Sequence, residues 1–538
     1  MPVTLATASM RTRDGVRLDA DVYRPDGAGP WPVLLMRQPY GRKIASTVVY
    51  AHPSWYAAHG YMVVIQDVRG SGTSEGTFKL FEHERTDGAD TLAWVATLPG
   101  SNGRIGMYGF SYQAVTQFLA LAGALDSGGP MPAALCPSMA GWSIHSDWAY
   151  EGGAFCLAGN MGWALQMGAE RARLAEDVAA YVAMQAAAKG PPLHEERMAW
   201  PAVLQRHSQY THYADWIGNP QPGGYWDRIS PQAALASRTG DVPMLHVGGW
   251  YDQMLEGTLA GYAAMADSKA PQRLIVGPWG HVPWGRRVGS VDFGPDASSP
   301  IDSEQIRWFD RFLNDRGEAQ SPVRLFDLGG KAWRDFAAWP DPAPQAWHLS
   351  SSGLATARTE DGKLDRKPPQ APWRDTIVHD PWRPVPSLGG HDGQPPGAQD
   401  RGALDGRTDV ACYTSAPLPA PLKLAGRVSA ELDIEADAPS HDLLVVLSQV
   451  TPDGRALTLT QGYLRRAGSV PCAVSMRAIC TTIPAGAALR LSLQGSSFPA
   501  FTVNPGTGAG AADTRLFDCR IITLAIRAGR LLLPVEGA

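Results

Sequence analysis

A serine at position 111 stands where a buried strand changes into an apolar helix. The segment 104–110 before it ends in Gly109-Phe110, and the segment 112–122 after it is rich in apolar residues. This order is typical of a nucleophile elbow, a strained strand-to-helix turn that presents a serine hydroxyl above a parallel sheet. A serine hydroxyl is a weak nucleophile alone, so acyl-transfer chemistry also requires a base and an orienting acid within reach.

A second serine, Ser74, has to be weighed against Ser111. Ser74 matches the pattern Gly-x-Ser-x-Gly in full over 72–76, whereas the Ser111 site has Gln113 in place of the second glycine. The surroundings favour Ser111, because 69–76 is a glycine-rich loop and no apolar helix begins after Ser74. Ser111 could also be an ordinary helix N-cap, a role that an elbow serine does not exclude.

Candidates for the acid and the base lie further along the chain, at Asp252 and His281. Asp252 follows the apolar strand 243–247 and a short glycine-containing stretch, and His281 follows the strand 273–276 in the same way. All three residues therefore belong to strand carboxyl ends at one edge of the predicted sheet, in the order Ser, Asp, His that α/β-hydrolases use. In that arrangement His281 takes the serine proton and returns it to the leaving group, while Asp252 fixes the imidazole tautomer.

The elements that would position these residues follow from the hydrophobic pattern. Asp14-Gly15 predicts a hairpin between 4–11 and 16–23, and beyond it short apolar runs alternate with helical stretches as a parallel α/β sheet requires. We predict strands over 33–37, 62–66, 105–109, 133–136, 244–247 and 274–276, and helices over 87–95, 112–125, 255–266 and 303–313.

At 538 residues the chain is too long for one core, and we predict several units. We predict the fold class α/β: an α/β-hydrolase domain with an inserted helical cap, followed by a C-terminal β-sandwich. Within the cap, 169–189 reads as the clearest helix, and the proline- and glycine-rich stretch 339–402 reads as a linker with a few edge strands. The predicted boundaries are 1–139 for the first part of the hydrolase domain, 140–235 for the cap, 236–340 for the second part of the hydrolase domain and 341–538 for the β-sandwich.

Composition excludes several kinds of partner. The formal net charge is −5 with no basic run, which argues against nucleic acid and against an anionic membrane. No run of roughly 18 apolar residues suits a membrane span, and the first residues lack the pattern of a signal peptide, so we expect a cytoplasmic protein. The six cysteines and the histidines show no metal-ligand spacing, so we expect free thiols and no metal. The tryptophans between 142 and 284 suggest an aromatic-walled pocket, although core filling explains any single one equally well.

Several segments together carry a resemblance to a known family. They are Arg-Gln-Pro-Tyr-Gly at 37–41, the glycine-rich stretch 66–76, the Ser111 elbow, Gly-Pro-Trp-Gly-His at 277–281 and Leu-Leu-Leu-Pro-Val at 531–535. On these motifs the chain resembles the cocaine esterase-like (CocE/NonD) hydrolases, which are related to the X-prolyl dipeptidyl-peptidases (S15) and the α-amino acid ester hydrolases. The resemblance covers nearly the whole chain. It implies a hydrolase domain, a helical insertion and a jelly roll, and a serine hydrolase that acts on esters or amides without any cofactor.

The resemblance also implies roles for further residues. It puts the oxyanion hole at the backbone N–H of Tyr112 and the phenol of Tyr40, and a tyrosine hydroxyl, protonated at neutral pH, can donate to a developing oxyanion. The alternative for Tyr40 is a partly buried aromatic residue at a strand end. Relatives usually carry a glycine where this chain has Ala114, which should suit a helix. The family lines its substrate pocket at the positions of Trp148 and Met254, with Tyr150 and Phe155 as neighbours.

One position discriminates among these relatives. The α-amino acid ester hydrolases carry an acidic pair, which binds the substrate ammonium, where this chain has Met254-Leu255. An apolar pair cannot hold an ammonium group by charge, although Glu151 in the cap leaves the point open. We therefore predict a hydrolase of carboxylic esters with neutral hydrophobic or aromatic acyl groups. The alternatives are an amidase or acylase on amide or β-lactam side-chain substrates, and a non-catalytic ligand-binding protein. The expected partner is a small ester or amide, and the sequence leaves open whether the chain forms a homodimer.

Overall fold

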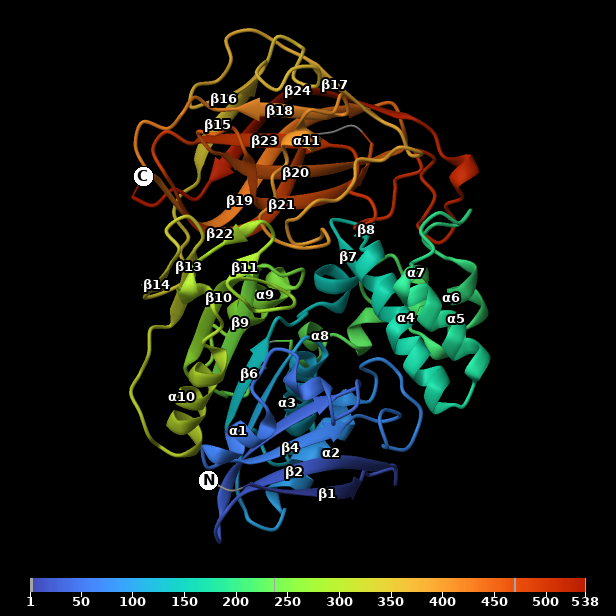
Figure 1. The fold of residues 1–538 in the computed structure, drawn as a ribbon, viewed down its shortest axis with the longest axis vertical. Helices are drawn as coiled ribbons and strands as arrows, with labels where there is room; N and C mark the ends of the chain where they lie inside the picture. The colour runs from blue at the N-terminus through green and yellow to red at the C-terminus, as the bar shows by residue number, and fades with distance from the viewer. Residues whose placement is uncertain (1–2, 237, 469–470, 538) are drawn as a thin grey trace.

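The computed structural model describes residues 3–236, 238–468 and 471–537, and two ten-stranded sheets form the framework of this part of the chain (Figure 1). The first sheet, from the N-terminal half, carries helices on its faces. The second, at the opposite end of the molecule, is almost entirely β. A group of helices lies beside the junction of the two. This is the predicted fold class, an α/β-hydrolase domain with a helical insertion and a C-terminal jelly roll.

The first sheet has ten strands in the order β1-β2-β4-β3-β5-β6-β9-β10-β13-β14. Neighbours from β4 to β13 are parallel, and the strands at both edges are antiparallel. Parallel strands covered by helices on both faces read as continuous apolar runs, which is why the sequence revealed them. The predicted strands and the hairpin are confirmed, and most strands run longer than predicted. The bounds are β1 Val3–Arg11, β2 Arg17–Pro25, β3 Trp31–Gln38, β4 Met62–Asp67, β5 Ser101–Phe110, β6 Ala134–Ser138, β9 Met244–Tyr251, β10 Gln272–Gly280, β13 Val323–Asp327 and β14 Ala332–Phe336.

Helices pack on both faces of this sheet. Side chains of α2 and α3 join one buried cluster and those of α1 and α10 join another. α2 and α3 approach so closely that a Cβ added at Gly123 would lie 1.9 Å from the carbonyl oxygen of Arg85. The four predicted helices are confirmed. The bounds are α1 Pro53–Ala58, α2 Glu84–Ala96, α3 Tyr112–Ser127, α9 Leu255–Ala264 and α10 Ile301–Leu313.

The helical insertion lies between β6 and β9.

Within the insertion, the prediction of a single helix over 169–189 is wrong, because the chain turns between α4 and α5. Glu176 has a positive φ of 60°, and the Asp177 side chain accepts a hydrogen bond of 3.0 Å from the N–H of Ala180, which caps α5. The elements are η2 His145–Ala149, β7 Tyr150–Glu151, β8 Ala154–Phe155, α4 Leu157–Leu174, α5 Val178–Lys189, α6 Ala202–Arg206, η3 Ser208–Tyr210, α7 Tyr213–Gly218, η4 Trp226–Arg228 and α8 Pro231–Leu235.

The second sheet follows the order β21-β20-β23-β18-β16-β15-β24-β19-β22, with β17 paired to β24. Its end strands approach each other, since the Thr460 hydroxyl on β21 donates to the carbonyl of Arg477 on β22 (2.7 Å), so the sheet nearly closes around an apolar core. The bounds are β15 Gln345–Ser350, β16 Gly362–Asp365, β17 Asp375–His379, β18 Val410–Thr414, β19 Leu422–Ala436, β20 Ser440–Val450, β21 Ala456–Ala467, β22 Cys472–Ile483, β23 Ala488–Gln494 and β24 Ile522–Leu533.

The interpretation of 339–402 as a linker is wrong. β15 and β16 lie in the middle of the second sheet, and the alternating side chains Trp347, Leu349 and Leu364 are buried in its core. These strands are short and stand among many prolines and glycines, so local composition concealed them. The segment boundaries predicted at 139, 235 and 340 stay predictions, although element types change near each of them.

Two further findings bear on the class of protein. Within the described residues, no helix combines the length and apolar character needed to cross a membrane. All six cysteines are free thiols, as predicted; five are buried, and Cys156 is half-buried.

Candidate functional site

Ser111 occupies a sharp turn between β5 and α3. Its backbone has φ 59° and ψ −126°, a strained conformation for a residue with a side chain, and its N–H donates to the carbonyl of Ser138 at the end of β6 (3.0 Å). The Ser111 side chain makes no capping hydrogen bond to α3. Its hydroxyl is therefore not used as an N-cap and stays available for other chemistry.

The residues on either side explain why Gln113 is tolerated in this turn. Gly109 has φ 144°, and a Cβ added there would lie 2.4 Å from the Cβ of Gln113, so the first glycine is required. Gln113 folds back toward the turn, and its Oε1 accepts a hydrogen bond from the N–H of Phe110 (3.2 Å). Gln113, in the first turn of α3, thus stabilises the strand-to-helix connection through its side chain.

Asp252 and His281 form a hydrogen-bonded pair. Their atoms Oδ1 and Nδ1 lie 2.8 Å apart, with the Asp252 side chain fully buried and the His281 side chain 24% exposed. Asp252 comes directly after β9 and His281 directly after β10, and these parallel strands are neighbours. An N–H at Nδ1 can donate to this carboxylate, and in that tautomer the other ring nitrogen of His281 keeps its lone pair.

The same edge of the sheet brings the elbow next to this pair. The end of β6 links them, because Ser138 binds Ser111 through its carbonyl and the N–H of Met139 donates to Val247 of β9 (2.7 Å). The ring of Phe110, the residue before the serine, lies 5.5 Å from the ring of His281. The three residues singled out from the sequence therefore follow the carboxyl ends of β5, β9 and β10, with β6 between β5 and β9.

Ser74, the alternative nucleophile, is engaged in the loop itself. Its hydroxyl donates to the carbonyl of Asp67 (2.8 Å) and accepts from the N–H of Asp19 (2.9 Å). With both roles filled by backbone groups, Ser74 holds the loop to the first hairpin.

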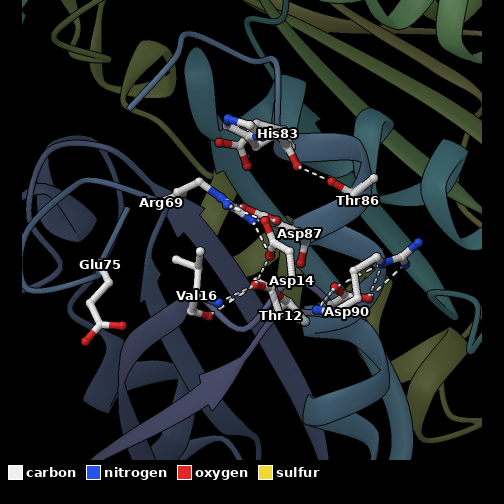
Figure 2. Close-up of polar contacts among 12 residues, drawn as sticks. Thr12, Asp14, Val16, Arg69, Glu75, His83, Thr86, Asp87 and Asp90 are labelled. Carbon is white, nitrogen blue, oxygen red and sulfur yellow. Dashed lines mark hydrogen bonds and ion pairs between the residues drawn. The ribbon is translucent and has the colours of Figure 1, made fainter. Parts of the chain in front are cut away.

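The glycine-rich loop after β4 is fastened by Arg69. Figure 2 shows its guanidinium reaching between Asp14 of the hairpin turn and Asp87 of α2, with shortest contacts of 2.7 Å to each. Hydrogen bonds with Arg69 and Thr12 hold the pKa of Asp14 well below its usual range, so this carboxylate is ionised. The family-like segment 66–76 therefore has a clear structural role.

Tyr40 follows β3 and is positioned beside the serine. Burial raises the pKa of its phenol to about 12, against smaller opposing effects of the nearby Trp163 and Ser111 side chains. The phenol is therefore protonated at neutral pH, in reach of the Ser111 side chain, and able to donate a hydrogen bond. This position suits an oxyanion-hole donor.

Tyr112 is the first residue of α3, and the first N–H groups of a helix have no acceptor within it. The phenol of Tyr112 donates a hydrogen bond to the carboxylate of Glu84 on α2 (2.8 Å). Glu84 in turn forms an ion pair with Arg37 of β3 (2.6 Å). Sequence reasoning missed Glu84, because nothing local marks a residue in α2 as a neighbour of the elbow.

Aromatic side chains connect the elbow to the cap. The ring of Trp148 stacks on Trp163 (4.8 Å) and meets the edge of Phe81 (5.7 Å), and Phe81 stacks on Tyr112 (4.4 Å). Trp163 and Phe81 were missed, although the tryptophan-rich composition of this region is a signal for Trp163. Trp148 is therefore connected through Phe81 to Tyr112, the residue after the candidate nucleophile.

The other predicted pocket residues are buried. Tyr150 donates its phenolic hydrogen to the carbonyl of Trp216 (3.0 Å), and Phe155 packs against Tyr150 and Tyr213 in the cap. Met254 is fully buried just before α9. Their role in binding substrate stays a prediction.

Glu151, which left the question of an ammonium site open, is already paired. Its carboxylate lies 2.8 Å from Nε2 of His391 and 2.9 Å from the guanidinium of Arg477. Although burial acts to raise it, these neighbours lower the pKa of Glu151 to about 2. Nor, among the residues described, is any group of three or more His, Cys, Asp and Glu side chains arranged to hold a metal ion.

Comparison with known proteins identifies the family. Residues 14–283 match the X-Pro dipeptidyl-peptidase (S15) family, and 314–525 match the X-Pro dipeptidyl-peptidase C-terminal non-catalytic domain. The chain belongs to the S15 family. This confirms the resemblance to S15-related hydrolases that the sequence motifs indicated.

Two curated relatives extend over most of the S15 chain. Cocaine esterase of Rhodococcus sp. (strain MB1 Bresler) is 33% identical over 549 residues, which cover 94% of this chain and 92% of that protein. A putative serine esterase of Mycobacterium bovis is 26% identical over 84% of this chain and 79% of its own length.

Solved structures share the fold of this S15 protein. An aminopeptidase from a marine sediment Thaumarchaeota archaeon aligns with a TM-score of 0.83 at 22% identity, covering 99% of this chain and 96% of its own. An α-amino acid ester hydrolase aligns with a TM-score of 0.80 at 21% identity, covering 99% and 97%. A CocE/NonD family hydrolase from Staphylococcus aureus has a TM-score of 0.67 at 17% identity, covering 99% and 94%.

Proposed function

We propose that this S15-family chain is a serine hydrolase that cleaves carboxylic esters with neutral hydrophobic or aromatic acyl groups. The observation that carries the proposal is the 2.8 Å hydrogen bond between Asp252 and His281 at the strand ends beside the strained Ser111 turn. The esterase names of the two curated relatives support the same reaction class.

In the proposed reaction Ser111 Oγ attacks the ester carbonyl while His281 Nε2 takes its proton. The carbonyl oxygen becomes an oxyanion, which accepts hydrogen bonds from the Tyr40 phenol and the Tyr112 N–H. The intermediate expels the alcohol, which receives the proton from His281, and an acyl-Ser111 ester remains. Water then attacks this ester with His281 as base, the acid leaves and Ser111 regains its proton.

Three features support a neutral acyl group. Met254 and Leu255, just after Asp252, are fully buried apolar residues, which cannot pair with an ammonium group. Glu151 is engaged by Arg477 and His391. Aromatic rings, in turn, contact the elbow through Phe81 and Trp148, and such rings favour flat apolar groups.

Cleavage of amides is the second candidate, because the matched family is named for dipeptidyl-peptidases. The same acyl-enzyme forms from an amide if His281 protonates the leaving amine. Esters and amides with the same acyl group therefore have to be compared directly, including amides that carry a β-lactam.

The decisive experiment combines labelling with turnover. A fluorophosphonate probe should label the wild type and Ser74→Ala but not Ser111→Ala. A panel of p-nitrophenyl esters and matched anilides should show turnover by the two labelled proteins and background rates for Ser111→Ala. Labelling of Ser111→Ala but not Ser74→Ala would reverse the assignment. Failure of the wild type both to react and to turn over any substrate would favour a non-catalytic binding protein.

A further inference from the structure

A cavity of about 740 Å³ lies between helix α4 of the cap and the segment 70–82 of the hydrolase domain. Ser111, Asp252 and His281 are not among the described residues that line it. Its walls come from the segment 70–82, from the middle and end of α4, and from the stretch 208–225. The cavity therefore does not include the three candidate catalytic residues, and its lining residue Phe78 lies 6.2 Å, ring to ring, from Tyr112 beside the elbow.

Arg171 on α4 lines this cavity with hydrogen-bonding capacity unused. The residue is 9% exposed, and its Nε and Nη1 atoms are buried without a hydrogen-bond partner. One contact is made by Nη2, which donates to the Ser71 hydroxyl (3.2 Å), and the guanidinium carbon lies 3.9 Å from the centre of the Phe78 ring. The neighbouring carboxylate on α4, Glu170, is paired with Arg173 instead (2.7 Å).

A second residue that lines the same cavity has a ring nitrogen without a hydrogen-bond partner. His212 is 7% exposed, and its Nε2 atom is buried without a partner. Burial and the charge of Arg171 lower the pKa of His212 to about 3, so the ring is neutral. A neutral imidazole can donate one hydrogen bond without adding a second positive charge.

We propose that this cavity binds the carboxylate group of a small organic acid, with Arg171 as the main ligand-binding residue. Buried donors without acceptors are costly, and a carboxylate matches the planar fork of a guanidinium through two parallel hydrogen bonds. Phe78 and Tyr225 provide an aromatic wall for the body of the acid.

Other charges in the cavity narrow the ligand to a monocarboxylate. Glu82 and Asp215 also line it, and Glu82 lies 3.8 Å from Lys79. Burial and the charge of Glu82 raise the pKa of Asp215. A second negative charge on the ligand would meet these carboxylates, whereas a neutral aromatic or aliphatic body would not.

Calorimetric titration of the full-length protein with benzoate tests the proposal, with benzamide as the uncharged probe of the same shape. We expect benzoate to bind the wild type and benzamide not to bind. Arg171→Met should weaken benzoate at least about tenfold, as the loss of a charge-assisted hydrogen bond implies. The matched control, Arg173→Met, removes an exposed arginine from the same helix and should keep the wild-type affinity.

Two results would overturn the proposal. One is a benzoate affinity that is the same in Arg171→Met and the wild type; Arg171 would then only clamp the segment 70–82 to α4. The other is no benzoate binding to the wild type below about 10 mM. If Arg171→Met does not fold, Arg171→Gln replaces it, and the wild-type titrations with benzoate and benzamide still decide the matter.

Kinetic measurements distinguish two sources of the bound carboxylate, a substrate of the enzyme and a free organic acid. If it belongs to the leaving group of a substrate, Arg171→Met raises KM for 4-acetoxybenzoate and leaves KM for phenyl acetate, which has the same neutral acyl group, unchanged. If it belongs to a free acid, both KM values stay the same while benzoate binding still depends on Arg171. Both results support the site. The calorimetric arm does not require hydrolysis, so failure of the proposed esterase function would leave it intact.

Discussion

The phenol of Tyr112 donates a 2.8 Å hydrogen bond to the carboxylate of Glu84, which anchors the residue after the candidate nucleophile to helix α2. Glu84 is itself paired at 2.6 Å with Arg37, a fully buried residue of β3. These two contacts connect the elbow to strand β3 and to helix α2. Since the backbone of Tyr112 supplies a proposed oxyanion donor, this anchor bears on catalysis as well as stability.

Glu84→Gln should weaken both properties. The substitution removes the negative charge and leaves the Arg37 guanidinium buried without its ion pair, a change that typically costs about 3–5 kcal/mol. We expect a clearly lower Tm by calorimetry and a reduced kcat with little change in KM. Glu82→Gln, a neighbour in sequence that lies on the surface, is the control. An unchanged kcat and Tm in Glu84→Gln would show that the elbow does not depend on this carboxylate.

Tyr40→Phe should lower kcat by a factor of about 10² to 10³, the usual effect of removing one oxyanion-hole donor. The ring remains and only the hydroxyl is lost, so KM should change little, because the interaction strengthens as charge develops on the oxygen. Steady-state kinetics with one good ester substrate measures both constants. A near-normal kcat with a lower Tm would instead indicate a structural tyrosine and point to the Gly41 amide as the second donor.

Asp252→Asn and His281→Ala should each be severe, with losses of up to about 10⁴ in kcat, since the base loses its correct tautomer or is absent. Combining either substitution with Ser111→Ala should add little, because residues that act as a unit are not additive. Turnover of the single and double variants on one ester tests this. Losses that multiply in the double variants would contradict a triad.

His246, buried on β9, should make stability depend on pH. Burial lowers the pKa of its imidazole to about 4, whereas the pKa of a histidine in the unfolded chain is about 6.5. As the pH falls from 6.5 toward 4, the unfolded chain takes up a proton that the folded protein does not, so stability is present above pH 6.5 and is lost below it. The slope is up to about 1.4 kcal/mol per pH unit.

The Tm of His246→Leu should therefore fall less than the Tm of the wild type between pH 7.5 and pH 4.5. Calorimetry at several pH values in this range measures both profiles. His59→Gln, a change at an exposed histidine, should follow the wild-type profile. Parallel profiles for wild type and His246→Leu would show that this histidine does not contribute to the acid sensitivity.

Local patterns in the sequence were enough to predict the parallel sheet and to single out Ser111, Asp252 and His281. Buried strands are continuous apolar runs, and a strand, a glycine, a serine and an apolar helix follow one another directly in the chain. The same patterns failed where the signal is short. The pattern over 169–189 predicted one helix where the structure has the end of α4 and all of α5. The short strand β15 was not predicted, because the sequence around it is rich in proline.

Tertiary structure alone decided which distant residues meet. Glu84 reaches Tyr112 because α2 packs against α3, and Trp163 reaches Trp148 and Tyr40 because the cap folds over the strand ends. The two guanidinium nitrogens of Arg171 that lack a partner are likewise visible only once α4 lies on the segment 70–82. A sequence records periodicity and spacing along one chain, whereas these contacts depend on how whole elements pack, and no local pattern encodes that packing.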